Sequence, residues 1–546
     1  MKLNQHDVGG EIISILTRGM YADPKDALRE YVQNGVDAGS LSIDIKIRQN
    51  NIVIEDEGCG MDKVVMRKAL RLGISDKNPK RAVGFMGIGL YSSFHLCDTL
   101  TITSRIGGKT PNRLQFEFKK MRDVLDAQKE QRIDAEAIVP DQIALLTLME
   151  ENTSLIELIT TDYPAVGTRV ELSGLEPDFF DSLSKFDEVA DYLEKSIPLP
   201  FSPKFKYGQE IQECIEKICR EHDADFKTIN LKLQINTREE NLYKPYVDDD
   251  FNPEPLKPIF KELVSADGFL GIAWGCLNKA TEIIKNEDVR GFLIKKHGFT
   301  IGTRNNLLGV FGAKFFNRYV GEFIIVHPKL LPNGARSEFE YSPLRTTLKK
   351  VIQDTANEFN SEANKHQEIE KAEVELDKLI KLYRETKAHL IGLAASREML
   401  LDRYGLVQKA YNSVKKRYDT GYKIKESRRS DAKGILELTF QLIKEISDLL
   451  TQKKEQQKKS TSIQRSEIAE ELKTAPTAHD YAEPQPHNFI EVVELIGIPF
   501  NDEVREIFRL IDQTYIRVRS KNEDDYLDQL KKIKSEIEDL LSDEES

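Results

Sequence analysis

The chain has 546 residues, of which 40% are hydrophobic and 31% charged, and its formal net charge at pH 7 is −12. This length is too great for one hydrophobic core, so we expect about three folded units. The acidic balance argues against nonspecific nucleic-acid binding by the whole chain, although it permits a local basic patch. The five cysteines form no CxxC pair, which argues against a disulfide framework or a zinc knuckle. The sequence lacks an apolar run of membrane-spanning length and a signal-peptide pattern, which predicts a cytoplasmic protein that does not contact membranes.

The first 175 residues alternate between helical and strand patterns. An apolar stripe around residues 12–16 and the segment "ADPKDALREYVQNGVDAG" predict helix up to residue 40. Alternating isoleucines then predict a β-hairpin over residues 43–54. A helix is expected at "KVVMRKALRLGIS", and further strands at "DTLTITSR", "RLQFEFKK" and "GTRVELSGL". This pattern predicts an α/β sandwich, in which a mixed sheet carries helices on one side.

The remainder of the chain changes character twice. From about residue 185, short strands, the first of them "NLKLQIN", lie between helical segments and predict a second α/β domain. Beyond residue 350, charged helices with apolar positions on one side predict a helical bundle or coiled coil. The polar segment 452–487, with prolines near its end, predicts a linker before a last helical segment. The expected domains are therefore 1–185, 186–350, 351–451, 452–487 and 488–546.

The helix predicted at "ALREYVQNGVDAGS" places three polar residues on one face. Glu30, Asn34 and Asp37 are spaced i, i+4 and i+7, so their side chains project together. A carboxylate that accepts a proton and an amide oxygen that ligates Mg²⁺ are groups that a phosphate–metal site needs. The alternative is a solvated helix face, and the segment alone does not decide between the two.

Two glycine-containing motifs follow this helix. In "IVIEDEGCGMD" a strand ends at Asp56, where a carboxylate can accept a hydrogen bond from an exocyclic amine such as that of adenine; an ordinary acidic turn is the alternative. The loop "GFMGIGLYSSF" leads into a helix, whose free N–H groups favour phosphate. Its spacing, G-x-x-G-x-G, is neither the Rossmann pattern nor a Walker motif.

Together, the three motifs resemble the N, G1 and G2 boxes of the GHKL ATPase superfamily, which unites gyrase, Hsp90, histidine kinases and MutL. They read "E-x-x-x-N-x-x-D-A", "D-x-G-x-G-M" and "G-x-x-G-x-G-x-Y-S", in this order within the first hundred residues. The resemblance is strongest to Hsp90-like ATPases, through "YADPKDALREYVQNGVDA", "ISDK" and "GTRVEL". It covers residues 1–175 and implies a Bergerat-type α/β sandwich that binds ATP and Mg²⁺.

This resemblance implies a role for each matching residue. Glu30 would be the general base for water attack, Asn34 the Mg²⁺ ligand and Asp56 the reader of adenine. Residues 74–86 would form a lid over ATP, in which Lys77 is either a phosphate contact or an exposed loop lysine. The other residues implied in the ATP site are Asp37, which supports the pocket, Gly58, Gly60, Met61 and Thr168 on the adenine side, and Gly84, Gly87, Ile88 and Gly89 on the phosphate side.

In this superfamily a transducer domain follows and supplies a cation that completes the ATP site. The segment "VHPKLLPNGARSEFEYSP" loosely resembles the Hsp90 middle-domain loop whose arginine contacts the γ-phosphate, so Arg336 is the candidate. A surface salt bridge is the alternative for Arg336. Lys295, Lys296 and Arg304 are further candidates for the same role. The C-terminal helices match no motif of the Hsp90 dimerisation domain, which weakens the implication of a client-binding role.

The segment "SVKKRYDTGYKIKESRR", residues 413–429, combines basic residues with two tyrosines. This pattern is compatible with nucleic-acid binding, but we favour a solvated helix end. The long helices are expected to dimerise the chain or to dock a partner. Coiled-coil arms on such an ATPase also resemble the clamps of MORC and MutL proteins.

The sequence therefore predicts an Hsp90-like ATPase whose Mg-ATP cycle closes the lid and rearranges a homodimer, as a chaperone-like or conformational machine acting on a protein client or partner. A first alternative is a MORC- or MutL-like, ATP-gated nucleic-acid clamp, for example in anti-phage defence. A second alternative is a non-catalytic scaffold that senses nucleotide.

Overall fold

The computed structural model describes residues 7–21, 23–75, 77, 84, 86–133, 142–159, 166–279, 281–420 and 424–474. The chain divides into two compact units, residues 1–449 and 450–546. Most of the expected lid over residues 74–86 and the whole predicted helical segment over residues 488–546 lie outside the described residues.

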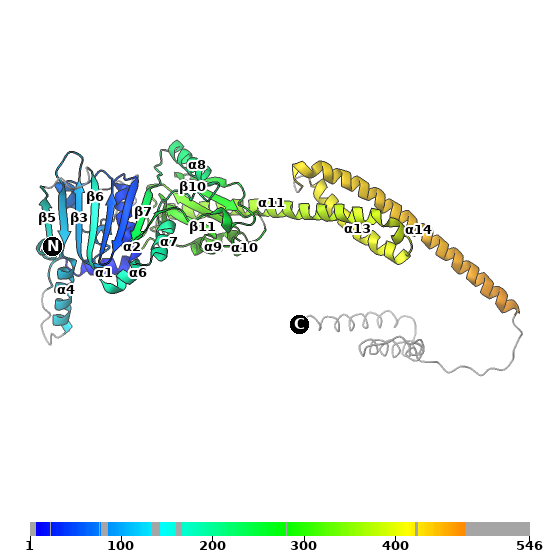
Figure 1. Cartoon of the computed structure of the whole chain (residues 1–546), viewed down its shortest axis with the longest axis horizontal. Helices are drawn as coiled ribbons and strands as arrows, with labels where there is room; N and C mark the ends of the chain where they lie inside the picture. Colours follow the sequence, from blue (N-terminus) through cyan, green and yellow to red (C-terminus); the bar gives the residue numbers. More distant parts are fainter. Residues whose placement is uncertain are drawn as a thin grey trace, which may run out of the picture. The chain divides into compact units, whose positions relative to one another are not determined.

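The N-terminal part is built on one eight-stranded mixed sheet. Its order is β5-β4-β3-β6-β2-β1-β7-β8, which Figure 1 follows from β5 through β3 and β6 to β7. All neighbours pair antiparallel except β1 and β7, which are parallel. The strands are β1 (Ser42–Arg48), β2 (Asn51–Asp56), β3 (Cys97–Arg105), β4 (Asn112–Phe116), β5 (Thr153–Glu157), β6 (Gly167–Leu175), β7 (Asn230–Ile235) and β8 (Arg238–Leu242).

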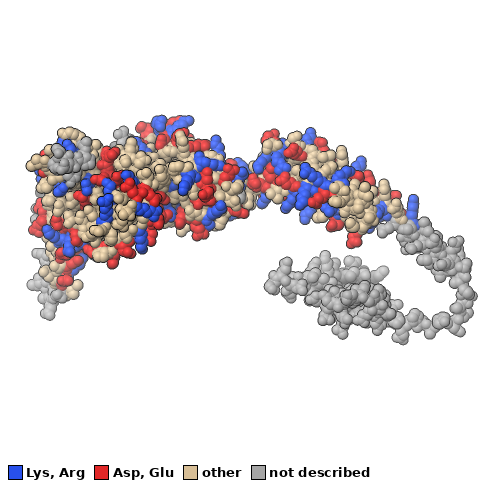
Figure 2. Space-filling view, in the orientation of Figure 1, with Lys and Arg blue, Asp and Glu red and all other residues tan. Residues whose placement is uncertain are grey.

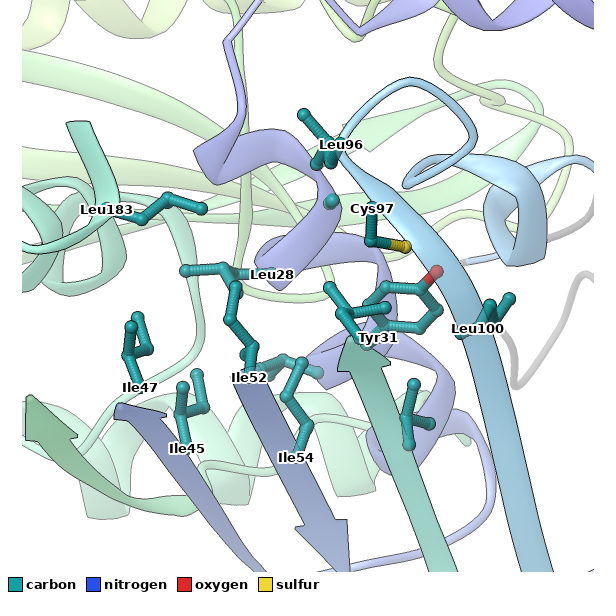
Figure 3. Close-up of a cluster of buried hydrophobic side chains, with 14 of the residues drawn as sticks. Leu28, Tyr31, Ile45, Ile47, Ile52, Ile54, Leu96, Cys97, Leu100 and Leu183 are labelled. Carbon is teal, nitrogen blue, oxygen red and sulfur yellow. The ribbon is translucent and has the colours of Figure 1, made fainter. Parts of the chain in front are cut away.

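Helices share one hydrophobic core with this sheet. Figure 3 shows Leu28 and Tyr31 of α2 in one cluster with Ile52 and Ile54 of β2, all of them buried. The other face of the strands carries charge, for example the ion pair between Lys46 Nζ and Glu55 Oε2 at 2.8 Å. The predicted α/β sandwich is confirmed. Its helices are α1 (Ile12–Met20), α2 (Lys25–Asp37), α3 (Lys63–Ala69), η1 (Gly89–Tyr91), α4 (Phe118–Ile133), α5 (Leu145–Glu151), α6 (Pro177–Leu183) and α7 (Phe186–Ser196).

The strand "NLKLQIN" belongs to this first sheet, so its assignment to the second domain was wrong. β7 pairs with β1 in parallel, from Ser42 opposite Asn230 to Ile47 opposite Ile235. Its residues Leu231 and Leu233 are buried in the N-terminal core. Strand alternation identifies a half-buried strand but does not say which sheet edge will accept it, so the sequence pattern could not place this strand.

The predicted second α/β region is confirmed as a five-stranded sheet of order β12-β11-β13-β10-β9. Helices cover both faces, since α8 packs in one core with Trp274 and Ile324, and α9 and α11 pack in another with Phe292 and Phe323. The elements are α8 (Gly208–Glu221), η2 (Asp248–Asp250), β9 (Ile259–Ser265), β10 (Gly268–Leu277), β11 (Gly291–Lys296), β12 (Phe299–Ile301), α9 (Asn305–Phe311), α10 (Ala313–Phe316) and β13 (Tyr319–Ile325).

Long helices follow, as predicted. α11 (Pro343–Ala388) begins at Ser342, whose hydroxyl accepts a hydrogen bond from the Arg345 N–H and caps the helix. It is followed by α12 (Leu390–Leu393), α13 (Arg397–Asp419), η3 (Glu426–Arg428) and α14 (Arg429–Thr474). α11, α13 and the start of α14 share a small core that includes Leu376, Val414 and Ile435. Among the described residues, no helix combines the length and the apolar character that a membrane crossing requires.

The predicted linker over residues 452–487 was wrong for its first part. α14 continues through this polar stretch to Thr474, and residues 475–487 lie outside the described residues. The stretch from 452 to 474 contains neither glycine nor proline, and glutamine, lysine and glutamate are good helix formers. Polarity alone therefore did not identify a linker here, because a solvated helix has the same composition.

Candidate functional site

A cavity of about 550 Å³ lies between α2, the end of β2, the glycine loop and a loop of the second α/β region. Its size is typical of a pocket that encloses a small organic ligand. The structure brings together twelve of the fourteen residues expected at the site, because the cavity is lined by Glu30, Asn34, Asp37, Asp56, Gly60, Met61, Lys77, Gly84, Gly87, Gly89, Thr168 and Arg336.

Gly58 and Ile88, the other two expected residues, do not line the cavity. The Gly58 N–H donates a hydrogen bond of 2.8 Å to Oδ1 of Asp56, so Gly58 positions this carboxylate. Ile88 is buried at the start of η1. Their motif positions therefore support the site rather than border it.

Asp56 lies at the end of β2 in a half-buried position within the cavity lining. Burial raises the pKa of its carboxyl to about 6, although hydrogen bonds from the backbone of Gly58 and Thr168 oppose the shift. A carboxylate with only two backbone donors keeps lone pairs for a further donor. Asp56 can therefore accept a hydrogen bond from a ligand amine above about pH 6.

Thr168 joins Asp56 to the glycine turn through a hydroxyl network. Ser104 Oγ lies 2.9 Å from Thr168 Oγ1 and accepts a hydrogen bond of 2.8 Å from the Met61 N–H. Gly60 has a φ of 70°, and a Cβ there would overlap the carbonyl oxygen of Arg105. The turn therefore requires glycine at this position. Ser104 was not predicted from the sequence, because its contact with Met61 spans 43 residues.

The polar face of α2 points into the cavity, which rules out the alternative of a solvated face. Glu30 is 7% exposed, and the side chain of Asp37 is 1% exposed. Lys77 Nζ donates hydrogen bonds of 2.8 Å to both Asn34 Oδ1 and Asp37 Oδ2. The Gly84 N–H donates to the same Asp37 oxygen at 3.0 Å. Asp37 thus ties both Lys77 and the first glycine of the loop to α2.

Glu30 forms a buried ion pair with Arg336 of the second α/β region. Arg336 Nε donates to Glu30 Oε1 at 2.9 Å, and both side chains are 9% exposed, so the alternative of a surface salt bridge is excluded. Arg29 Nη2 lies 3.7 Å from the same oxygen. Burial by itself would raise the pKa of Glu30, but the guanidinium groups of Arg336 and Arg29 outweigh it and hold this pKa below its ordinary value. Glu30 is therefore a carboxylate near neutral pH.

Arg336 reaches the cavity from a tight loop centred on Asn333. Oδ1 of Asn333 accepts a hydrogen bond of 2.9 Å from the Ser337 N–H, and the Arg336 N–H donates to the Asn333 carbonyl at 2.9 Å. Pro332, Asn333 and Gly334 also line the cavity. This loop therefore holds the arginine in place by its own hydrogen bonds.

The other cations considered for this role do not line the cavity. Lys295 Nζ pairs with Glu322 at 3.3 Å and donates to the Lys195 carbonyl. Lys296 Nζ donates to the His327 carbonyl at 2.7 Å, and Arg304 donates to backbone carbonyls of the second region. Arg336 is thus the candidate whose side chain the structure places against Glu30.

Gln33 and Tyr21 also line the cavity, although neither residue was predicted from the sequence. Gln33 is 0% exposed, and neither amide atom has a hydrogen-bond partner in the described structure. Its position three residues after Glu30 and four before Asp37 placed it on the same helix face, so helical spacing could have identified it.

The lining residues fit a nucleotide with a divalent cation. Arg336 Nη1 and both amide atoms of Gln33 are buried without a partner, which leaves donors available for a ligand. The described residues contain no group of three or more His, Cys, Asp or Glu placed to hold a metal. Mg²⁺ commonly takes few protein ligands and completes its shell with phosphate oxygens and water, so Asn34 Oδ1 is a suitable single ligand.

Most basic residues in the described part of segment 413–429 form ion pairs with acidic residues of the helical region. Arg417 contacts Glu375 at 2.7 Å and Glu368 at 3.1 Å, and Arg428 contacts Glu373 and Asp377. In the view of Figure 2, lysine and arginine are interspersed with aspartate and glutamate over the described surface. This arrangement is that of a solvated helix surface with internal ion pairs, as the sequence interpretation favoured.

Comparison with known proteins agrees with this geometry. Residues 21–146 match the model of the family described as histidine kinase-, DNA gyrase B- and HSP90-like ATPase. Proteins named chaperone protein HtpG are similar: 27% identical in Rickettsia canadensis, with 18% of this chain and 21% of the relative covered, and 25% identical in Rickettsia prowazekii, with 18% and 22% covered. The chain thus spans about a fifth of the length of the curated relatives it matches.

The matched residues include α2 with its polar face, β2 with Asp56, and the glycine loop. Arg336 and the long helices lie outside the matched range. Residues 21–146 of this chain therefore form a domain of the GHKL type, which histidine kinases, DNA gyrase B and Hsp90 share.

Proposed function

We propose that this chain binds ATP with Mg²⁺ and hydrolyses it, using Glu30 as general base and Arg336 as the cation that completes the site. The observation that carries this proposal is the buried contact between Glu30 and Arg336 inside the cavity. The cavity contains a base and a cation in contact with each other, and it also contains Asp56, which can accept a hydrogen bond from an amine. This combination suits a purine nucleoside triphosphate.

Each residue has a chemical task in this proposal. Asp56 accepts a hydrogen bond from the adenine amine, with Thr168 and Met61 beside it. Asn34 Oδ1 holds Mg²⁺, which supplies positive charge to the phosphates when bound. Glu30, ionised at neutral pH, takes the proton of the attacking water, as the bond between the γ-phosphorus and the departing ADP oxygen breaks. Arg336 stabilises the charge on the transferred phosphoryl group, for which its free Nη1 is available.

The ATP cycle would then act on the contact between the two α/β regions, because Arg336 holds Glu30 through Nε while its unpaired Nη1 is available to a phosphate. We further propose closure of residues 74–86 over ATP, a homodimer, a cytoplasmic location and a protein client or partner, as in a chaperone-like or conformational machine. The ion pairs of segment 413–429 do not favour a nucleic-acid clamp. The alternative of a non-catalytic nucleotide sensor differs from our proposal in one respect: the chain would bind ATP but would not hydrolyse it.

The test is ATP binding by calorimetry and phosphate release with Mg²⁺, using wild type, Arg336→Ala and Arg220→Ala, an exposed arginine of α8 that serves as control. We expect Arg336→Ala to bind ATP and to release phosphate about 100-fold more slowly, whereas Arg220→Ala behaves as wild type. Binding without any phosphate release by the wild type would support the nucleotide sensor. Absence of ATP binding by the wild type would refute the proposal.

The partner can be sought with Glu30→Ala held in ATP. Capture from native cells, with and without nuclease, separates protein partners from nucleic acid. Nuclease-resistant capture that depends on ATP would support a protein client, and nuclease-sensitive capture would support the clamp.

A further inference from the structure

We propose that Gln33 is a nucleotide-contacting residue, whose side-chain amide donates a hydrogen bond to a phosphate oxygen. This inference rests on the proposed function, because it requires that the cavity bind a nucleotide. It adds a phosphate contact from α2 that none of the three motif patterns includes.

The first observation is the unpaired state of a buried amide. Gln33 is 0% exposed and lines the cavity, and neither Oε1 nor Nε2 has a hydrogen-bond partner in the described structure. Buried side-chain amides are nearly always hydrogen-bonded, since an unpaired one loses its water without compensation. An unpaired amide at a cavity wall is therefore a group that a ligand can satisfy.

The second observation is where the amide lies within the cavity. A Cβ built on Gly84 would be 2.5 Å from Gln33 Nε2, 3.1 Å from Asp37 Oδ2 and 3.3 Å from Lys77 Nζ. Three polar groups thus converge on the first glycine of the loop. Gly35 is two residues further along α2, about 200° around the helix, and a Cβ there would meet Asp56. Gln33 therefore points to the glycine-loop side of the cavity, away from the adenine side.

The hydrogen-bond donors on the glycine-loop side of the cavity favour an anionic ligand. The amide nitrogen of Gln33 provides two N–H donors, and it lies near Gly84, as does the ammonium group of Lys77. The glycines of this loop have no side chain, so a ligand can approach the backbone closely. A phosphate oxygen accepts hydrogen bonds from such donors, whereas the adenine amine that Asp56 would bind is itself a donor. The side-chain oxygen of Gln33 remains available for water.

Gln33→Met and Gln33→Glu test the inference. Methionine has nearly the same length without polar atoms, and glutamate keeps the shape but removes both donors and adds a negative charge. Gln441→Met, an exposed position on α14, is the matched control. Dissociation constants for ATP, ADP and adenosine would be measured by calorimetry on the full chain, and thermal unfolding would be measured without nucleotide.

We expect Gln33→Met to weaken ATP and ADP by about 10- to 100-fold, to leave adenosine unchanged, and to keep or raise the unfolding temperature, since it removes an unpaired buried amide. Gln33→Glu should weaken ATP at least as much, so it decides the question if the methionine variant fails to fold. Wild-type affinity of Gln33→Glu for ATP would overturn the inference. An equal loss for adenosine would overturn it too, because the contact would not be with phosphate.

The same measurements separate this inference from the proposed function. Wild-type protein that binds none of the three ligands refutes both. Wild-type protein that binds ATP, together with Gln33 variants that bind it equally well, refutes only the role of Gln33.

Discussion

Arg336 Nε donates a hydrogen bond of 2.9 Å to Glu30 Oε1, although the two residues are 306 positions apart in the chain. The contact joins α2 of the ATPase domain to a loop of the second α/β region inside one cavity. The proposed base is thus paired with the proposed phosphate-binding cation. A phosphate that binds the unpaired Nη1 of Arg336 would share this guanidinium with Glu30, which would couple the ligand's charge to the contact between the two regions.

Replacing Glu30 with glutamine should separate ATP binding from hydrolysis. Glutamine keeps an oxygen that accepts from Arg336 but cannot take a proton from water. We expect phosphate release to fall by about 100-fold or more, while the dissociation constant for ATP changes by only a few fold. Single-turnover phosphate release and calorimetry measure the two quantities, and Glu151→Gln, at the exposed last residue of α5, is the control. Normal hydrolysis by Glu30→Gln would show that another group is the base.

The affinity for ATP should depend on the protonation of Asp56. Burial raises the pKa of this carboxyl to about 6, and a protonated carboxyl donates from one of its oxygens. We therefore expect the affinity to fall as the pH decreases through about 6, because fewer molecules hold the carboxylate that accepts from the adenine amine. Calorimetry between pH 5 and 8 measures this change. A flat profile across this range would contradict the role of Asp56 as acceptor.

Asp56→Asn should bind ATP poorly and yet stabilise the fold at neutral pH. The folded-state pKa of Asp56 lies above its ordinary value of 3.8, because burial disfavours the charged carboxylate. The stability that the fold has while this carboxyl is protonated is therefore lost as the pH rises through about 6. The neutral asparagine avoids this loss, which predicts a gain of about 2 to 3 kcal/mol in the free energy of unfolding at pH 7. Urea unfolding of Asp56→Asn and of the exposed control Asp181→Asn measures the gain. A destabilised Asp56→Asn would contradict it.

Three glycine-to-alanine variants should separate backbone strain from close packing. Gly60 and Gly39 both have positive φ, but only Gly60 faces a backbone carbonyl, while Gly107 has open space. We expect Gly107→Ala to be near neutral, Gly39→Ala to cost about 1 kcal/mol of unfolding free energy and Gly60→Ala to cost more than that. Equal losses for Gly60→Ala and Gly39→Ala would show that the turn relaxes around the added methyl group.

Local patterns predicted much of the first domain. The spacing of Glu30, Asn34 and Asp37 indicated one helix face, and alternating isoleucines indicated the β1–β2 hairpin, since both features depend on residues close in sequence. The pairing of β7 with β1 was not predictable in this way, because edge pairing depends on which sheet has a free edge.

Contacts in the site between residues far apart in the chain were likewise not predictable from local sequence patterns. The resemblance selected Arg336, but the sequence could not distinguish a buried contact with Glu30 from a surface salt bridge. Ser104 reaches Met61 and Thr168 only after β3 and β6 pair. Gln33 was overlooked although its helix face was already identified, because glutamine takes part in no proton-transfer chemistry that would have selected it.

Reversing the charge of Arg417 should weaken the helical bundle rather than remove a nucleic-acid site. Arg417 makes a two-pronged contact with Glu375, at 2.7 and 3.0 Å, and reaches Glu368 at 3.1 Å. Arg417→Glu would place three carboxylates together, which we expect to cost roughly 2 kcal/mol of unfolding free energy. Adding Glu375→Arg should recover part of this loss by restoring an opposite-charge pair. Thermal unfolding measures both variants.

Lys416→Glu is the matched control, because Lys416 is adjacent to Arg417 but is exposed on α13. We expect this variant to unfold at the wild-type temperature, since a charge change at an exposed position alters stability little. Binding to DNA at low salt would be measured for wild type, Arg417→Glu and Lys416→Glu. Salt-sensitive binding that both reversals abolish, without a change in the unfolding of Lys416→Glu, would restore the clamp hypothesis, because affinity would then follow the basic charge of the segment rather than the integrity of the bundle.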